Sequence, residues 1–318
     1  MNFSITIPAY KTRFLRECID SVLAQTYTDF EVIILNDASP EDVEGIVGSY
    51  SDSRIRYYKN EENVGAVNLV DNWNKCLELA VGDYIICMGD DDKLMPDCLE
   101  QYARMIEKYP EVDLFHARTL RIDEQGKPIG ISQGYPEHER VFQFMLHRLN
   151  YGIQFIGDFC YRTNKLRQVS GYYWLPLAWG TDYITSYIVA KRKGVVHLPS
   201  ITFCYRSNST TISNTGNVEL KLQAFSKEMK WYEEFLQEES EQDLEEALCL
   251  FELKQRCPTY FKKNKARIIS YDLKQSPLRL FHWMWCRKTY RLSLNNQHSD
   301  FRSNDDKTHV FPEYLSQK

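Results

Sequence analysis

The sequence has no excess of positive charge and no long hydrophobic run. The formal net charge is -5 and the isoelectric point about 5.9, so no global attraction to nucleic acid exists, and a nucleic-acid role is not expected. No stretch approaches the roughly 20 apolar residues that a membrane-spanning helix needs. The opening MNFSITIPAY lacks the basic and apolar regions of a secretory signal. We therefore expect a cytoplasmic protein.

Cysteine pairs and metal-binding cysteine motifs are also missing. The nine cysteines are odd in number, scattered, and never spaced as C-x-x-C. This pattern predicts reduced, mostly buried thiols and argues against both a zinc site and a disulfide framework. A hydrophobic content of 43% with 26% charged residues is typical of a globular chain, and no repeats or low-complexity linkers interrupt it.

The first hundred residues alternate strand-like and helix-like patterns. Short apolar stretches predict strands at residues 3–7, 31–35, 54–59 and 83–88. Apolar residues at helical spacing lie between them, at residues 14–23, before residue 50, and at residues 69–81. Strands joined by helical crossovers predict an α/β fold with a mostly parallel, Rossmann-type sheet and helices on both faces. In such sheets ligands bind at the carboxyl ends of the strands. Residues 8–10, 36–39 and 89–92 fall at these ends, so we expect three polar loops to converge on one crevice.

The remaining chain is less regular. It predicts a helix that ends near residue 110, a strand at 112–117, a hairpin turning at 124–127, helices at 138–149 and 181–194, and a strand at 195–206. Long charged helices follow at 220–236 and 244–253. Residues 277–291 combine three large aromatic side chains with four cations, which is typical of an interfacial segment, although aromatic stripes also occur in protein cores.

Three consecutive aspartates, Asp90, Asp91 and Asp92, end the fourth predicted strand. Three like charges repel one another and cannot be buried unpaired. A solvated acidic turn is one interpretation. The other is a divalent cation that carries a phosphate, because Mg²⁺ and Mn²⁺ prefer carboxylate oxygens and complete their shells with phosphate and water.

Several segments together resemble one enzyme family. They are IPAYK, EVIILNDASPED, ENVG before a long helix, GDYIICMGDDD, WGTDY and CYRSNSTTIS, in this order over residues 3–213. The chain resembles the family 2 glycosyltransferases of the GT-A fold. That resemblance implies an inverting transfer of a sugar from a nucleotide diphosphate-sugar, with UDP as the expected nucleotide, to a hydroxyl of a glycan.

The resemblance also implies roles for particular residues on the donor side. It places the nucleotide among Pro8, Ala9, Tyr10, Asp37, Asn63 and Asp90. Asp37 matches the aspartate that accepts a hydrogen bond from the base, and a carboxylate selects a base edge that presents N–H. Asp91 and Asp92 would hold the Mn²⁺ or Mg²⁺, which neutralises charge on the leaving nucleotide.

On the acceptor side, Asp182 matches the family's catalytic carboxylate and would take the proton of the acceptor hydroxyl. Alternatively, Thr181 or Asp182 only caps the following helix. Arg206 resembles the family's segment next to the diphosphate. Asp158 and Trp179 are candidates for the acceptor pocket, and a structural role for the tryptophan is equally open.

Some positions depart from the family pattern. Gly89 stands where a first aspartate is common, Asn36 replaces the first residue of the D-D-G-S motif, and Asn208 replaces a histidine. These changes encourage a second hypothesis, a glycan-assembly partner that keeps the fold without catalysis. A sugar nucleotidyltransferase is a third. That class has a glycine- and lysine-rich or arginine-rich loop after the first strand, which IPAYKTRFL lacks.

The predicted organisation has three parts: a nucleotide-sugar-binding half at residues 1–110, an acceptor and catalytic half of the same domain at 111–215, and a helical extension with a polar tail at 216–318. The family resemblance suggests bacterial surface-polysaccharide synthesis, with a lipid-linked acceptor at the inner membrane face. Residues 277–291 would then provide peripheral membrane contact.

Overall fold

The computed structural model describes residues 1–152, 154–208, 217–237, 243–275 and 279–286. Its chain forms two compact units, Met1–Phe261 and Lys262–Lys318. The boundary lies inside a long helix, whereas the sequence suggested boundaries at residues 110 and 215. The division into donor and acceptor halves stays a prediction. No helix of the described residues combines the length and apolarity that crossing a bilayer requires.

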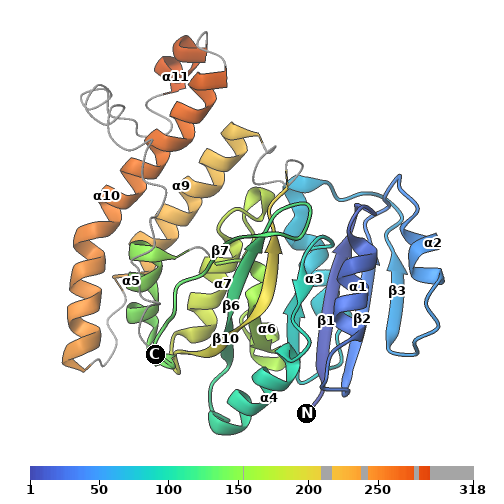
Figure 1. The fold of residues 1–318 in the computed structure, drawn as a ribbon. Helices are drawn as coiled ribbons and strands as arrows, with labels where there is room; N and C mark the ends of the chain where they lie inside the picture. Colours follow the sequence, from blue (N-terminus) through green and yellow to red (C-terminus); the bar gives the residue numbers. More distant parts are fainter. Residues whose placement is uncertain (153, 209–216, 238–242, 276–278, 287–318) are drawn as a thin grey trace. The chain divides into compact units, whose positions relative to one another are not determined.

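Regular elements of the first hundred residues follow the predicted alternation (Figure 1). They are β1 (Phe3–Ala9), α1 (Leu15–Leu23), β2 (Phe30–Asn36), α2 (Val43–Gly48), β3 (Ile55–Lys59), the 3-10 helix η1 (Ala66–Asn68), α3 (Leu69–Leu79), β4 (Tyr84–Cys87) and α4 (Cys98–Lys108). β1, β2 and β4 begin and end within a few residues of the predicted limits, because each is a mostly apolar run that is buried on both faces. β3 also lies within its predicted limits, but it is only partly buried.

The second part of the first unit contains the remaining strands and shorter helices. These are β5 (Lys93–Leu94), β6 (Leu114–Ile122), β7 (Pro128–Ile131), β8 (His138–Glu139), α5 (Val141–Tyr151), η2 (Ile156–Asp158), β9 (Phe159–Arg162), α6 (Thr163–Gln168), η3 (Pro176–Ala178), α7 (Thr181–Ala190) and β10 (Val195–Arg206). The predicted hairpin is formed by β6 and β7, which pair antiparallel. Strands β5, β8 and β9 had not been predicted, because two are only two residues long and the third has four.

One sheet runs through the unit in the order β3-β2-β1-β4-β9-β6-β10-β5, with β7 and β8 paired at its side. β1, β2, β3 and β4 are parallel. β9 is antiparallel to both β4 and β6, so β6 and β10 run in the same direction as the first four strands. The mostly parallel GT-A-type sheet is therefore confirmed, and the carboxyl ends of its long strands share one edge.

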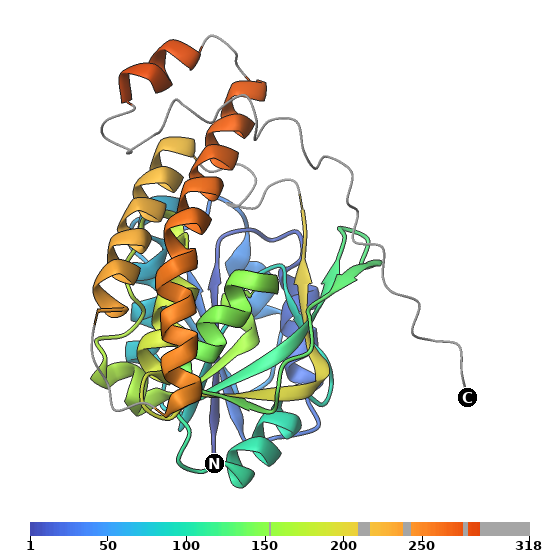
Figure 2. The same ribbon diagram turned by 90° about the vertical axis from the view of Figure 1, so that its left-hand side faces the viewer.

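Helices cover both faces of the sheet. Alternate residues of β1, such as Ile5 and Ile7, share a buried core with Ile19 of α1 and Leu99 of α4. α3 packs against β1, β2 and β4, where Cys76 lies next to Thr6, a residue on the opposite face of β1. α7 packs on β6 and α5 on α7, as Figure 2 shows from the side. All nine cysteines are free and seven are buried, as predicted.

The C-terminal helices are α9 (Val218–Phe235), α10 (Leu244–Gln275) and α11 (Leu280–Cys286). α10 contains Pro258 and is much longer than the predicted helix at 244–253. Parts of the predicted segment 277–291 and the polar tail lie outside the described residues.

Candidate active site

Three loops meet at the carboxyl ends of β1, β2 and β4. Asp90 Oδ2 accepts hydrogen bonds from the backbone N–H groups of Tyr10 and Lys11, both at 2.8 Å. The N–H of Asp37 donates to the carbonyl of Ala9 at 3.0 Å. The predicted convergence of these loops on one site is therefore confirmed. Tyr10 stays 42% exposed, so its ring is accessible to a planar ligand, while Pro8 lies within β1 opposite Leu35 of β2.

Asp37 connects the β2 loop to the loop after β3. Its Oδ1 accepts from Asn60 Nδ2 at 2.8 Å and from the N–H of Val64 at 3.0 Å, and its Oδ2 accepts from Asn63 Nδ2 at 2.9 Å. A carboxylate offers about four lone-pair directions. The three bonds leave one of them for an N–H group, which is what recognition of a uracil or guanine edge requires.

The loop after β2 is shaped by Asn36. Its Oδ1 accepts from the N–H of Ser39 at 2.9 Å, and its Nδ2 donates to the Tyr57 hydroxyl at 2.8 Å. Asn36 thus uses both the donor and the acceptor of its amide at this position. The helix α2 begins after this loop, and its N-cap Asp42 accepts from Gly45 N–H at 2.8 Å.

Asp91 and Asp92 have different surroundings. Asp91 is partly exposed, and its Oδ2 accepts from Asn208 Nδ2 at 2.5 Å. Asp92 is only 4% exposed, and its Oδ1 accepts the N–H of Arg206 at 2.9 Å. Burial raises the pKa of both carboxyls, and it raises the pKa of Asp90 to about 6. Three carboxylates gathered at a strand end are costly unless a cation compensates them.

Gly89 makes room for this cluster. A Cβ atom at that position would lie 2.9 Å from Asp91 Oδ1 and 3.1 Å from Asp92 Oδ2. Any side chain would push the two carboxylates apart. The absence of a side chain at Gly89 therefore lets the Asp91 and Asp92 carboxylates approach the same small space. It also means that this position contributes no carboxylate of its own.

The residues at this edge fit a divalent cation. Asp91 offers a partly exposed carboxylate, and oxygens of both Asp91 and Asp92 lie close to the bare face of Gly89. Oxygen ligands of this kind suit Mg²⁺ or Mn²⁺, which take one or two carboxylates and complete their shells with phosphate and water. Within the described ranges, no group of three or more His, Cys, Asp or Glu side chains forms a complete metal cage.

Arg206 is a structural connector in this structure. It is 1% exposed, and its guanidinium donates to the Asp91 carbonyl at 2.9 Å, to the carbonyls of Asp123 and Glu124 at 3.4 and 3.3 Å, and to Glu17 Oε2 at 2.8 Å. These bonds hold the aspartate turn, the β6–β7 turn and α1 together. Because its guanidinium is engaged by these partners, we propose no diphosphate contact for Arg206, although the resemblance implied one.

Asp182 lies in the first turn of α7. The N-cap is Gly180, at φ 91°, and no side chain caps the helix, so the predicted alternative that Thr181 or Asp182 is the cap is wrong. Asp182 Oδ1 accepts the N–H of Tyr183 at 3.0 Å. A Cβ atom at position 180 would lie 2.9 Å from Glu228 Oε2, so α9 comes close to this loop and only glycine fits there.

A buried ion pair lies close enough to Asp182 to affect its pKa. Arg148 of α5 and Glu228 of α9 are almost fully buried, and Arg148 Nη1 lies 3.5 Å from Glu228 Oε1. The Arg148 guanidinium also lies 3.5 Å from the centre of the Tyr183 ring. Burial raises the pKa of Asp182 to about 7, an effect that Arg148 opposes and that Asp158 and Glu228 increase. A carboxylate with this pKa is matched to proton transfer near neutral pH.

The two acceptor candidates differ in exposure. Asp158 is fully buried, and its Oδ2 accepts from Thr119 Oγ1 at 3.0 Å and from the N–H of Phe155 at 3.1 Å. These contacts indicate a structural role for the Asp158 carboxylate, and we propose no acceptor contact for it. Trp179 is half-buried next to Gly180, and Lys221 Nζ lies 4.9 Å from its ring centre.

Sequence reasoning missed Asn60, Glu17, Arg148 and Glu228. Each acts through a partner that is distant in sequence, for example 84 positions between Arg148 and the Tyr232 hydroxyl, which are 3.2 Å apart. No local motif marks them. Asn60 alone had a weak signal, since it directly follows a predicted strand.

Comparison with known proteins identifies the family. The model of glycosyl transferase family 2 matches residues 4–168, just over half of the chain, and the chain belongs to that family. An uncharacterized glycosyltransferase of Rickettsia typhi is 35% identical over 112 residues, which are 35% of this chain and 34% of that protein. The putative glycosyltransferase EpsE of Bacillus subtilis is 33% identical over 117 residues, 36% of this chain and 41% of EpsE. The chain thus spans well under half of the length of these relatives.

Solved structures show the same fold at low sequence identity. S. aureus TarS 1–349, in complex with UDP-GlcNAc, aligns with a TM-score of 0.62 and 16% identity, over 93% of this chain and 78% of TarS. The mannosyltransferase PcManGT from Pyrobaculum calidifontis, in complex with GDP-Man and Mn²⁺, aligns with a TM-score of 0.52 and 12% identity, over 91% and 81%. Both likenesses support the GT-A fold.

Proposed function

We propose that this family 2 protein is an inverting glycosyltransferase, which transfers a sugar from a UDP-linked donor to a hydroxyl of a glycan. The observation that carries the proposal is the convergence of the three strand-end loops. Asp90 joins the β1 loop to the aspartate turn, and Asp37 joins the β2 loop to residues 60–64. Base, ribose and diphosphate would then be bound along one edge of the sheet.

Each donor-side residue has a defined task. Asp37 accepts a hydrogen bond from an N–H group of the base, and the exposed Tyr10 ring stacks on the base. Asn63 and the backbone of Pro8 and Ala9 shape the pocket. Asp90 fixes the β1 loop and turns its other oxygen to the ribose. Asp91 and Asp92 would hold a divalent cation, which would neutralise the charge that develops on the departing diphosphate.

The chemical step uses Asp182 as general base. The acceptor hydroxyl loses its proton to the Asp182 carboxylate while its oxygen forms a bond to the anomeric carbon. The bond from that carbon to the diphosphate oxygen breaks on the opposite face, and its electrons leave with the nucleotide. A single displacement of this kind inverts the anomeric configuration. The half-buried Trp179 ring is the proposed stacking surface for the acceptor sugar.

The structure offers reasons for the departures that encouraged a non-catalytic alternative. Asn36 uses its amide to close the β2 loop, Gly89 makes room for two carboxylates, and Asn208 donates to Asp91. All three are compatible with a working donor site, and none of them removes Asp182.

We further propose that the acceptor is lipid-linked and that α11 contacts a membrane surface. Within this helix Phe281 and Trp285 are 76% and 89% exposed and stand four residues apart, on one helix face. Trp283 is held inward by a hydrogen bond from its Nε1 to Asp272 Oδ2 at 2.8 Å. Exposed aromatic rings on one helix face are typical of interfacial helices.

A thermal-shift panel tests the donor site. UDP, GDP and CDP are added with and without Mn²⁺ or Mg²⁺ to the wild-type chain and to Asp91→Asn. Ligands that bind only the folded state raise the midpoint. We expect a UDP shift that needs the metal and disappears in Asp91→Asn, whereas Asp97→Asn, a nearby acidic control, keeps it. Absence of any nucleotide shift in the wild type would remove the basis of the proposed activity.

A further inference from the structure

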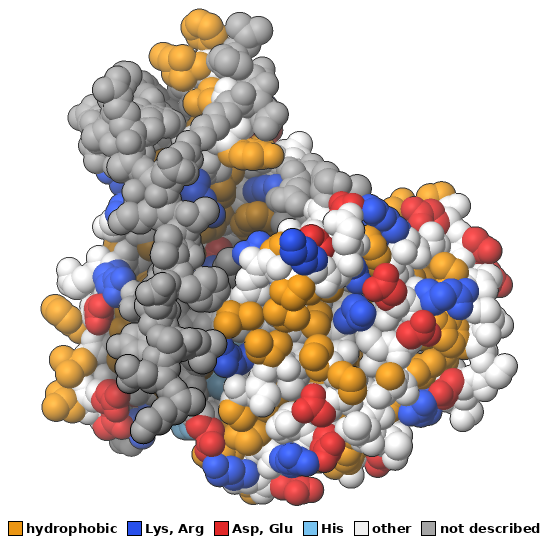
Figure 3. Space-filling view, viewed as in Figure 1, with side chains coloured by type: hydrophobic (Ala, Val, Ile, Leu, Met, Phe, Trp, Pro, Cys, Tyr) orange, Lys and Arg blue, Asp and Glu red, His pale blue; other side chains and the backbone are white. Residues whose placement is uncertain are grey.

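A second cavity lies away from the donor site and is strongly basic. It has a volume of about 350 Å³, and four cations with one carboxylate line it: Arg162, Lys165, Arg192, Lys193 and Asp113. Elsewhere, on the face drawn in Figure 3, cationic and anionic side chains are interspersed over the coloured part of the chain. Since the whole chain has a formal charge of -5, this concentration of positive charge is a local feature.

The cavity is at the opposite edge of the sheet from the three aspartates. Asp113 directly precedes β6, Lys193 precedes β10 by two residues, and Arg162 ends the antiparallel strand β9. The amino ends of the parallel strands therefore surround it, whereas the donor site uses their carboxyl ends. A ligand here would not compete with a nucleotide.

Asp113 compensates two of the cations. Its Oδ1 accepts from Arg162 Nε at 2.8 Å, and its Oδ2 lies 3.3 Å from Lys193 Nζ. Arg162 Nη2 also donates to the carbonyls of Pro110 and Val112, at 2.6 and 3.1 Å. These contacts hold one wall of the cavity in place, and the only carboxylate of the lining is committed to it.

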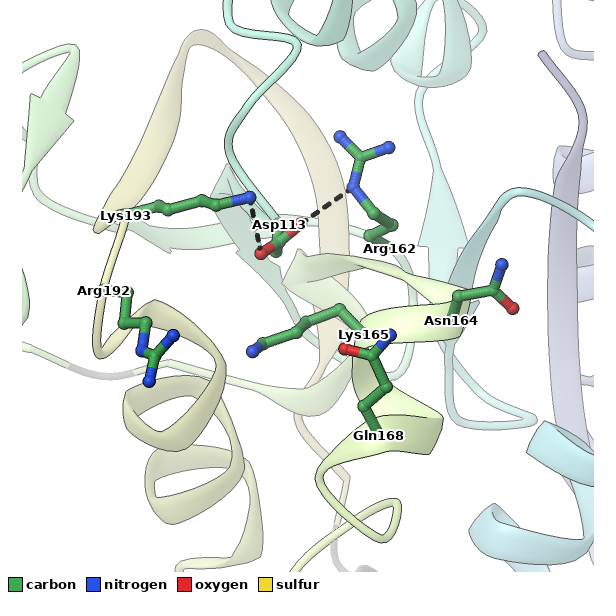
Figure 4. A pocket seen from close by; sticks show the side chains of 7 residues that line it. All are labelled: Asp113, Arg162, Asn164, Lys165, Gln168, Arg192 and Lys193. Atoms are coloured by element: carbon green, nitrogen blue, oxygen red, sulfur yellow. Dashed lines mark hydrogen bonds and ion pairs between the residues drawn. The ribbon is translucent and has the colours of Figure 1, made fainter.

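Lys165 and Arg192 have no such compensation. Neither side chain makes a hydrogen bond or ion pair with any residue that the structure describes. In Figure 4 the Lys165 ammonium extends toward the Arg192 side chain across the cavity. Cations are favourable at the ends of α6 and α7, near which these residues lie. That preference does not explain why the Lys165 side chain of α6 and the Arg192 side chain from the turn after α7 face the same space.

We propose that this cavity is a binding site for a phosphate group, held between Lys165 and Arg192 against the wall formed by Arg162 and Lys193. A phosphate monoester or dianion offers several acceptor oxygens, which suit the planar fork of an arginine and the point charge of a lysine. The ligand is either a free phosphate compound or the phosphate headgroup of an acidic lipid. The proposal is independent of the glycosyltransferase activity.

Titration calorimetry with inorganic phosphate, at constant ionic strength set with NaCl, tests the site on the full chain. We expect saturable binding to the wild type, and about tenfold weaker binding to Lys165→Gln/Arg192→Gln, because two charge-assisted contacts are lost. The control Lys254→Gln/Lys263→Gln changes the charge equally at exposed positions of α10 and should bind phosphate like the wild type. A retained metal-dependent UDP shift, or an unchanged unfolding midpoint, verifies that the double variant is folded.

Vesicle sedimentation distinguishes a lipid headgroup from a free phosphate compound as the ligand. The wild type and both double variants are sedimented with phosphatidylcholine vesicles that contain or lack phosphatidic acid. Binding to acidic vesicles that needs Lys165 and Arg192, and that inorganic phosphate displaces, assigns the site to a lipid headgroup. Phosphate binding without such vesicle dependence assigns it to a free phosphate compound. Undetectable phosphate binding, or equal affinity in the wild type and Lys165→Gln/Arg192→Gln, would overturn the proposal.

Discussion

At the scale of single residues, Asp182 carries the chemistry of the proposed mechanism. It lies in the first turn of α7, is partly exposed and accepts a hydrogen bond from Tyr183, and the desolvation of its carboxyl raises its pKa to about 7. Asp37 and Asp90, by contrast, are already engaged by backbone and amide donors, so they hold the loops of the proposed donor site together without a ligand.

Asp182→Asn should lower turnover by about 10² to 10⁴-fold, the usual contribution of a general base. The metal-dependent UDP shift should persist, because the asparagine leaves the donor loops intact. In the wild type, kcat/KM should fall about tenfold per pH unit below pH 7, where Asp182 becomes protonated. Radiolabelled sugar transfer measured across pH values checks both statements. A variant with wild-type turnover would exclude Asp182 as the base.

The same carboxyl affects stability. Its pKa is raised from 3.8 to about 7 on folding, so the folded state retains a proton that the unfolded state has lost. Stability from this group is therefore fully present below about pH 4 and declines as the pH rises to 7. Asp182→Asn should thus unfold at a higher temperature than the wild type at pH 8, with a smaller difference at pH 4, in calorimetric scans.

At the scale of elements, two helices that are far apart in sequence influence the pKa of Asp182, the proposed general base. Arg148 of α5 and Glu228 of α9 form a buried pair beside α7, and they act on Asp182 in opposite directions. α9 also packs on η3, directly before Gly180. α9 is therefore a part of the C-terminal extension that lies close to the proposed base within the first unit.

Substitutions of this pair should move the acidic limb of the pH profile in opposite directions. Glu228→Gln removes a negative charge that raises the pKa of Asp182, so the limb should shift to lower pH. Arg148→Gln removes the cation that lowers it, so the limb should shift to higher pH. The same pH series of kcat/KM measures both. Shifts of equal sign in the two variants would show that they act by distortion and not by charge.

Arg206 joins three elements, and its removal should be costly. Arg206→Met leaves the carbonyls of Asp91, Asp123 and Glu124 without this donor, and we expect a loss on the order of 3 kcal/mol in urea unfolding. Arg13→Met is the matched control, because Arg13 pairs with Glu124 on the surface and is 56% exposed. Such a pair contributes about 1 kcal/mol or less. Equal losses in both variants would contradict the connector role.

At the scale of the whole molecule, the mixed sheet explains why the site forms where it does. Six strands run in one direction, so their carboxyl ends bring Ala9, Asn36 and Met88 to one edge, and the polar loops that follow must meet there. The basic cavity lies at the opposite edge. Its ligand can thus be tested separately from the donor.

Membrane contact through α11 predicts a loss of vesicle binding in Phe281→Ala/Trp285→Ala. Large exposed aromatic rings contribute most of the apolar area of an interfacial helix. Flotation with vesicles of an acidic lipid should show reduced association for the double variant. Val81→Ala, at a residue that is 74% exposed and lies in a loop of the first unit, should associate like the wild type. Equal flotation of all three chains would exclude α11 as the contact.

Local sequence patterns determined much of this protein. The period of the apolar residues predicted β1, α1, β2, β3, α3, β4, α4 and β10, since burial on one or both faces leaves a regular trace in neighbouring positions. The polar residues directly after β1, β2 and β4 predicted the convergence of three loops, because parallel strands share their carboxyl edge.

Only the tertiary structure decided how the site is supported. The hydrogen bond from Asn208 to Asp91 spans 117 positions, and Arg148 meets Glu228 through a side-chain contact between α5 and α9. The short strands β5, β8 and β9 form because longer strands offer them partners. Such contacts depend on packing between distant segments, and packing leaves no pattern in adjacent residues. For this reason the loops of the donor site could be predicted from the sequence, whereas the burial of Arg206 and the surroundings of Asp182 could not.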